Sequence, residues 1–162
     1  MKRDATGTDH PPSRVETQAR TRAALLAAAR ECFLERGFHD ASVGEIARRA
    51  GYTTGALYSN FGGKDDLFLA MLDEHLVDRA QSQRHRMAEG ATFEEAVRAA
   101  ARDLHRAGER EPGMTPLTVE FWTYAASRPE LRERARALQA RQIEWIADLV
   151  RGVCERHGVR PG

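Results

Sequence analysis

The sequence contains few cysteines and no long apolar segment. Its two cysteines, Cys32 and Cys154, lie far apart and neither belongs to a CxxC pair. This spacing excludes a zinc ribbon or a secreted disulfide scaffold and predicts a reducing, cytoplasmic compartment. No apolar run approaches the roughly 20 residues that span a bilayer, and the first 14 residues lack the apolar core of a signal peptide. We therefore expect no association with a membrane.

Residue patterns typical of catalysis and metal binding are also missing. The six histidines show no HxxxH spacing, so we expect His75, His85 and His105 to be surface or pocket residues rather than metal ligands. No nucleophile–base pair and no phosphate-binding loop is recognisable. The sequence therefore predicts a protein that is not an enzyme, has no metal site and needs no cofactor.

Charge is nearly balanced over the whole chain but is unevenly distributed along it. The formal net charge is +1, and arginine outnumbers lysine by 23 to 2. Residues 1–64 hold ten basic against seven acidic residues, whereas residues 65–162 hold fifteen against seventeen. A mildly basic N-terminal part fits a phosphate-binding head on a neutral body, although the asymmetry alone is weak support.

Hydrophobic residues make up 41% of the chain, and their spacing predicts helices. Residues 1–16 are polar, include two adjacent prolines and are expected to form a disordered arm. A first helix is predicted from about residue 17 to residue 36, with Gly37 as its stop. Its apolar stripe consists of Leu25, Leu26, Ala29 and Phe33.

Two short helices are predicted directly after this one. Ser42 and Glu45 have the spacing of a capping box, which begins a helix that Gly51 ends. Thr53 then caps a second short helix that runs through Tyr58. Two short helices joined by a glycine-containing turn and packed on a longer helix form a helix-turn-helix.

The remaining chain also has helical periodicity, and nothing in it is typical of a strand. Further helices are predicted at 64–87, 92–108, 116–127 and 129–157. We therefore predict an all-α fold, with a three-helix head joined to a helical bundle. The stripe of the last helix is expected to consist of Leu131, Ala135, Leu138, Gln142, Ile146, Leu149 and Val153.

Residues 24–68 resemble the DNA-binding head of TetR-type transcriptional regulators. The matching positions are Leu25, Leu26, Ala28, Ala29, Phe33, Gly37, Phe38, Ser42, Ile46, Ala47, Ala50, Gly51, Gly55, Leu57, Tyr58, Phe61, Lys64 and Leu67. Residues 117–142 also resemble the effector domain of some members. The resemblance implies a DNA-binding domain at 17–77, with its helix-turn-helix at about 41–60, and an effector-binding and dimerisation domain at 78–162.

The resemblance also implies which residues contact operator DNA. In the major groove, base edges would be faced by Thr54, Gly55, Ala56 and Ser59. Phosphates would be contacted by Ser42, Thr53, Tyr58, Asn60 and Lys64. Many relatives carry a basic residue at position 54 and Ser or Thr at position 56, so the operator sequence does not follow from the resemblance. Without the resemblance, Tyr58 would be interpreted as core and Lys64 as a solvated charge.

The resemblance specifies the residues of the ligand pocket and the dimer interface less precisely than those of the DNA contacts. Pocket candidates are Met87, Leu104, Phe121, Trp122 and Tyr124, and at least one of the three aromatic residues is expected to be core packing instead. Relatives continue into two further helices that form their dimer, and this chain ends at Gly162. A homodimer is therefore expected to use apolar residues of the last helix that lie off its stripe: Ile143, Trp145, Val150 and Cys154.

These observations predict a sequence-specific DNA-binding regulator, most simply a repressor that an unknown small-molecule effector releases from double-stranded operator DNA. The alternative is a protein-interaction module that keeps the helix-turn-helix fold but does not repress alone.

Overall fold

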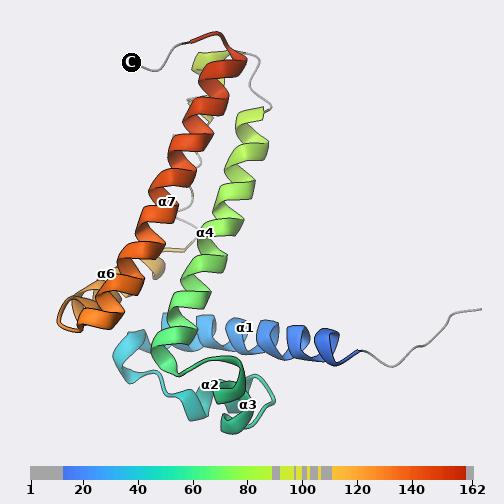
Figure 1. The fold of residues 1–162 in the computed structure, drawn as a ribbon, viewed down its shortest axis with the longest axis vertical. Helices are drawn as coiled ribbons and strands as arrows, with labels where there is room; N and C mark the ends of the chain where they lie inside the picture. Colours follow the sequence, from blue (N-terminus) through green and yellow to red (C-terminus); the bar gives the residue numbers. More distant parts are fainter. Residues whose placement is uncertain are drawn as a thin grey trace, which may run out of the picture.

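The structure is a computed structural model in which residues 13–88, 92–96, 98, 99, 102, 106 and 111–159 are described. Over this part of the chain it is helical and has no strand, which confirms the predicted all-α fold (Figure 1). The helices are α1 (Arg14–Asp40), α2 (Val43–Arg49), α3 (Thr54–Asn60), α4 (Lys64–Ala88), α6 (Met114–Ala126) and α7 (Pro129–Arg156).

Helix α1 begins three residues earlier than the predicted start at residue 17. The Ser13 hydroxyl accepts the N–H of Glu16, and the Glu16 carboxylate accepts the N–H of Ser13, which completes a capping box. The arm expected at residues 1–16 therefore does not reach residue 16, because residues 14–16 belong to α1. Residues 1–12 lie outside the described part of the chain. At the other end of α1 the backbone leaves helical geometry at Gly37, as predicted, and one further turn follows it.

The two short helices form as the sequence predicts. The Ser42 hydroxyl accepts the N–H of Glu45 at 3.2 Å, and the Thr53 hydroxyl accepts the N–H of Ala56 at 3.1 Å. Gly51 has a φ of +78° in the turn between α2 and α3, a conformation that costs glycine little. The described bonds do not include the second half of the Ser42 capping box, because the Glu45 carboxylate instead pairs with arginine side chains.

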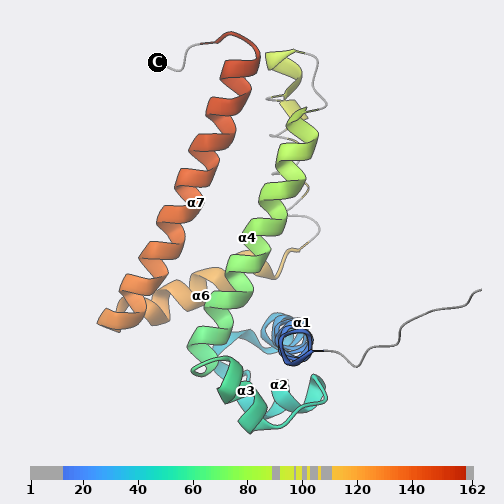
Figure 2. The same cartoon turned by 45° about the vertical axis from the view of Figure 1, so that its right-hand side comes forward.

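Helices α4 and α7 lie side by side and run in the same direction, while α6 lies across their lower end next to α1 (Figures 1 and 2). Two ion pairs join α4 to α7 one heptad apart, Asp66 with Arg134 and Asp73 with Arg141. Helix α4 thus connects the three-helix head to the rest of the molecule. None of the helices in the described part of the chain is both long enough and apolar enough to cross a membrane.

The contact face of α7 differs from the predicted stripe at one position. Ile146 is 45% exposed, whereas Trp145 is half-buried against α4. Two helices packed side by side meet along positions that repeat about every 3.5 residues. The side of α7 that faces α4 therefore includes Gln142 and Trp145, while Leu149 packs on Ala96 and Val153.

One apolar core extends from the head into α6 and α7. At its centre are four phenylalanines from three helices, Phe33 and Phe38 of α1, Phe68 of α4 and Phe121 of α6, none of which is exposed. The Phe68 and Phe121 rings are stacked with their centroids 4.3 Å apart. The position of the head therefore depends directly on the position of α6.

Candidate nucleic-acid interface and ligand cavity

Helix α3 presents a small, polar, accessible face. Thr54, Gly55 and Ser59 are exposed and Ala56 is half-buried, while Leu57 on the opposite side is completely buried. Leu57 therefore anchors the helix and leaves the residues predicted to face base edges accessible. Thr and Ser hydroxyls can donate to or accept from several bases, and a small helix face allows close approach to a groove.

Two of the residues predicted to contact phosphates already act as helix caps. The oxygens of Ser42 and Thr53 accept backbone N–H groups at the starts of α2 and α3. A hydroxyl that accepts one bond still has its own O–H to donate, so capping and phosphate binding are compatible. Tyr58 is 56% exposed, whereas the Asn60 amide donates to the carbonyl oxygen of Ala56 at 2.8 Å.

The Lys64 side chain binds backbone carbonyl groups of the protein itself. Its ammonium donates to the carbonyl oxygens of Phe38, His39 and Ala41 at 2.8, 2.9 and 3.2 Å, and lies 4.7 Å from the centroid of the Phe38 ring. An ammonium has three N–H donors, and all three have a partner here. A phosphate contact by Lys64, as the resemblance implies, would have to compete with these bonds, and the salt dependence of DNA binding decides between the two roles.

Arg22 of α1 is a cation next to α3 that the sequence did not single out. Its guanidinium lies 4.4 Å from the centroid of the Phe61 ring, and Nη1 donates to the carbonyl oxygen of Asn60 at 3.4 Å. Arg22 is exposed and 38 residues away from Asn60 in the chain. No local pattern connects the two residues, so only the packing of α1 on α3 identifies Arg22 as a candidate.

A cavity of about 290 Å³ lies between α4, α6 and α7. It is lined by Leu72, His75, Leu76, Arg79, Met114, Thr115, Thr118, Val119, Trp122, Leu138, Gln139 and Gln142. Of the predicted pocket residues, Trp122 lines this cavity. Phe121 belongs to the aromatic core, and Tyr124 packs on Phe38 with the centroids of their rings 4.8 Å apart. Leu104 and the side chain of Met87 lie outside the described part of the chain.

The polar side of the cavity includes His75. Burial lowers the pKa of the His75 imidazole, although the Glu111 carboxylate 3.4 Å away opposes the shift. Glu111 also forms an ion pair with Arg30 of α1. The Glu111 side chain therefore lies between His75 and Arg30 of α1.

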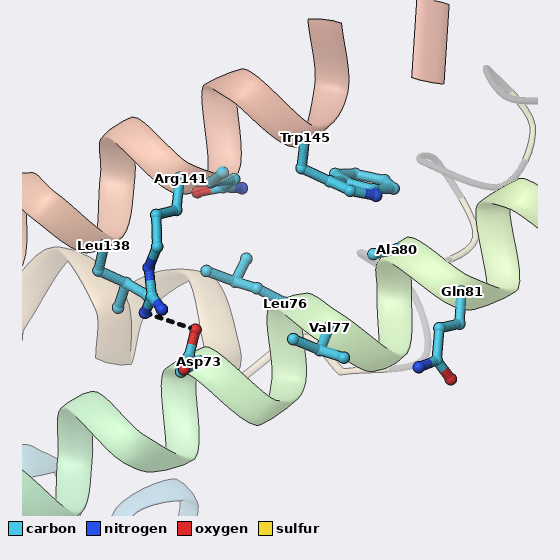
Figure 3. A pocket seen from close by; sticks show the side chains of 9 residues that line it. Asp73, Leu76, Val77, Ala80, Gln81, Leu138, Arg141 and Trp145 are labelled. Carbon is cyan, nitrogen blue, oxygen red and sulfur yellow. Dashed lines mark hydrogen bonds and ion pairs between the residues drawn. The ribbon is translucent and has the colours of Figure 1, made fainter. Parts of the chain in front are cut away.

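A second hollow of about 270 Å³ lies between α4 and α7, next to the first cavity (Figure 3). It shares Leu76, Leu138 and Gln142 with the first cavity. In Figure 3 Leu76 and Trp145 face the space between the two helices, and the ion pair of Asp73 with Arg141 lies toward the Leu138 end. The two spaces therefore adjoin at these shared residues.

The predicted dimer residues differ in accessibility. Ile143 is 62% exposed and Val150 is 46% exposed on α7. Trp145 is half-buried beside α4, and Cys154 is buried near the far end of the helix. Only the first two therefore present an apolar side chain freely on the surface of one protomer.

Comparison with known proteins places these features in a family. Residues 25–71 match the family described as "Bacterial regulatory proteins, tetR family". The HTH-type transcriptional repressor BepR of Brucella suis biovar 1 is 30% identical over 149 residues, which cover 86% of this chain and 68% of BepR. The HTH-type transcriptional activator FasR of Mycolicibacterium smegmatis is 38% identical over 79 residues, which cover 49% of this chain and 36% of FasR.

A solved structure of a transcriptional regulator superimposes on this chain. The transcriptional regulator SCO7518 of Streptomyces coelicolor A3(2) is 27% identical and superimposes with a TM-score of 0.64, covering 85% of this chain and 75% of that one. The chain spans about two thirds of BepR and about one third of FasR. The matched region contains the capped α2 and α3 helices, their connecting turn and the start of α4. The chain belongs to the TetR family of transcriptional regulators.

Proposed function

We propose that this protein represses transcription by binding a palindromic operator and that a small molecule releases it. The observation that carries the proposal is the exposed face of α3, which presents the short polar side chains of Thr54 and Ser59, while Leu57 on the opposite side is completely buried. Such a face fits the major groove, which accepts a helix and presents a distinct pattern of donors and acceptors for each base pair. The sign of regulation follows BepR, a relative named a repressor that aligns with 86% of this chain, rather than FasR, which is named an activator and aligns with 49%.

The groove contacts would be made mostly by neutral residues. Thr54 and Ser59 supply hydroxyls for hydrogen bonds to bases, while Ser42, Thr53 and Tyr58 supply O–H donors for phosphates on either side. Arg22 adds a cation beside the C-terminal end of α3. Phosphate contacts position the head, and base contacts set the sequence preference.

Selection of bound sites from random duplex DNA tests this proposal. Enrichment of a palindrome with half-sites about 34–36 Å apart is expected for a two-fold dimer of such heads. Thr54→Ala is expected to change the preferred base at one or two positions in each half-site, because it removes the hydroxyl and methyl group from the groove face. Affinity measured on single-base variants of the selected site checks this change.

The outcomes separate the proposal from its alternative. An unchanged base preference in Thr54→Ala would show that another residue reads these bases. If the unaltered protein enriches no sequence and binds duplex DNA weakly without salt dependence, the interaction-module alternative is favoured over a DNA-binding repressor.

The cavity between α4, α6 and α7 is the proposed effector site. Its wall is mainly apolar but includes the imidazole of His75, the guanidinium of Arg79 and the amides of Gln139 and Gln142. An apolar cavity with a few polar groups is typical of small-molecule sites. Screening metabolites for release of the selected duplex tests whether such an effector exists.

We further propose that two protomers associate through α7. Ile143, Ile146 and Val150 are exposed at spacings of three and four residues, which puts them on one face of the helix. A two-fold interface requires a patch that is complementary to its own copy, and an apolar helix face packed against the same face of a second copy satisfies this requirement.

Sedimentation across a concentration series is expected to show a dimer that Ile143→Glu and Val150→Glu shift toward monomer by at least about tenfold in dissociation constant. The reason is that each carboxylate would be buried without a partner in the interface. Glu133→Gln, an exposed change on the opposite half of α7, serves as the control. A strict monomer at tens of micromolar that neither substitution affects would contradict the proposal.

A further inference from the structure

Residues 37–41 form a corner between the straight part of α1 and the start of α2, and the backbone of this corner is unusual. Gly37 has a φ of +78° and a ψ of +174°, a combination that essentially only glycine adopts. The two N–H groups that follow, those of Phe38 and His39, both donate to one carboxylate, that of Glu120 on α6. The distances are 3.0 Å from Phe38 to Oε2 and 2.9 Å from His39 to Oε1. One side chain of α6 therefore binds the end of α1 with both of its oxygens.

Lys64 binds the same corner from the other side. The peptide unit between Phe38 and His39 accepts a hydrogen bond from the Lys64 ammonium through its carbonyl oxygen and donates to Glu120 through its N–H. Hydrogen bonds to charged partners are stronger than neutral ones, and bonds along one chain of dipoles strengthen each other. The corner is thus held between an ammonium of α4 and a carboxylate of α6.

The fit between Glu120 and the corner is close. A Cβ atom built at Gly37 would lie 2.8 Å from Oε2 of Glu120, so the carboxylate occupies the space that any other residue would need. The rings of Phe121 and Tyr124 pack on Phe38 with centroid distances of 5.1 and 4.8 Å. Three neighbouring side chains of α6 therefore contact the end of α1.

The same helix lines the proposed effector cavity. Thr118 and Trp122, on either side of Glu120 in the sequence, belong to the cavity wall. The corner in turn leads directly to Ser42, the N-cap of α2. A displacement of α6 by a molecule in the cavity therefore has a short path to the helix-turn-helix: Glu120, the Gly37 corner and the start of α2.

We propose that Glu120 is a positioning residue of the DNA-binding head that transmits the position of α6 to the α1–α2 corner. The regulatory meaning of this link rests on the function proposed above, whereas the link itself does not. Its two hydrogen bonds join specific atoms of α6 and the corner at a defined distance and direction, whereas an apolar contact is non-directional and fixes no particular pair of atoms. Loss of the carboxylate leaves the aromatic contacts of α6 with Phe38 and the Lys64 bonds in place, but it removes the two hydrogen bonds that join the backbone N–H groups of Phe38 and His39 to α6.

Hydrogen exchange of individual amides in the full chain, measured by NMR, tests the link without DNA. Glu120→Ala is expected to speed exchange at the N–H groups of Phe38 and His39 by about tenfold or more, since each loses a charged acceptor. Glu120→Gln has a single acceptor oxygen, so one of the two amides is expected to stay protected. Glu133→Gln removes the same charge from an exposed site on α7 and is expected to change neither. Unchanged exchange at both amides in Glu120→Ala would overturn the proposal.

Transmission is tested by filling the cavity. Thr118→Phe places a ring in the space between α4, α6 and α7 and is expected to shift the amide resonances of Phe38 and His39. In a Glu120→Ala background this shift is expected to disappear, whereas a purely structural Glu120 would leave it intact. Thr118→Leu repeats the test with a smaller side chain that the fold tolerates more readily. Equal shifts in both backgrounds, or no shift in either, would overturn the proposal.

DNA binding gives the regulatory readout. Glu120→Ala is expected to weaken binding of the selected duplex by about tenfold, as for a group that orients a binding surface, and Glu133→Gln is expected to leave it unchanged. A Glu120→Ala protein that binds this duplex as tightly as the unaltered one would contradict the regulatory role. If the unaltered protein binds no duplex, the function proposed above fails, while the exchange experiments still decide the link.

Discussion

Replacing Phe68 by alanine is expected to lower the free energy of unfolding by about 3–5 kcal/mol, the usual cost of removing a buried aromatic ring. The Phe68 side chain is completely buried, and its ring centroid lies 5.1 Å from that of Phe33, 5.2 Å from that of Phe38 and 4.3 Å from that of Phe121. The substitution therefore removes the ring that joins α4 to both α1 and α6.

Urea unfolding at one fixed protein concentration measures this effect, since association with a second copy makes apparent stability depend on concentration. Val119→Ala on α6 is the matched control, because Val119 is 59% exposed and surface changes usually stay within about 0.5 kcal/mol. A loss below about 1.5 kcal/mol for Phe68→Ala would mean that the aromatic cluster contributes little. Because domains are marginally stable, we expect the altered protein to be partly unfolded at elevated temperature.

The second large effect is expected for Lys64→Met, which keeps an apolar stem of similar length and removes the ammonium. The carbonyl groups of Phe38, His39 and Ala41 lose their shared donor. We expect the free energy of unfolding to fall by about 1.5–3 kcal/mol, as for other hydrogen bonds to charged groups. Affinity for the selected duplex is expected to fall as well, because the corner that precedes α2 loosens.

The salt dependence of DNA binding shows which role of Lys64 dominates. Each phosphate contact contributes about 0.9 to the slope of the logarithm of affinity against the logarithm of salt concentration. Since the three donors of Lys64 are engaged inside the protein, we expect Lys64→Met to lower affinity with little change in slope. Arg22→Met is expected to show the reverse pattern, with the slope reduced by about 0.9 and stability little changed. A slope reduced by about 0.9 in Lys64→Met would instead establish a phosphate contact.

The local features of the head could be predicted from the sequence because neighbouring residues determine them. Hydroxyl side chains at Ser42 and Thr53 satisfy N–H groups only three residues ahead, and Gly51 takes a φ that other residues avoid. The Ser13–Glu16 box belongs to the same class and was visible in the sequence, although the predicted start of the first helix fell beyond it.

The relations between distant segments could not be predicted in this way. The periodicity of the sequence predicted an apolar stripe on α7 that includes Ile146. In the structure α7 packs beside α4, and Trp145 is half-buried there while Ile146 is exposed. Phe121 and Trp122 are adjacent in an apolar helix, yet one is completely buried in the core and the other lines a cavity. Which residue does which depends on where α1 and α4 lie, and the sequence of α6 does not contain this information.

The sequence by itself determined the helices, their caps and their turns, since each depends on contacts within a few residues. It also carried the resemblance that identifies the head. Only the tertiary structure decided how these parts are joined. Lys64 reaches carbonyl groups 23 to 26 residues away, and Glu120 reaches N–H groups 81 and 82 residues away. Backbone groups left without a partner at the end of α1 must find one wherever the fold supplies it. The identity of that partner depends on the packing of α4 and α6 around the corner, which no local pattern in the sequence encodes.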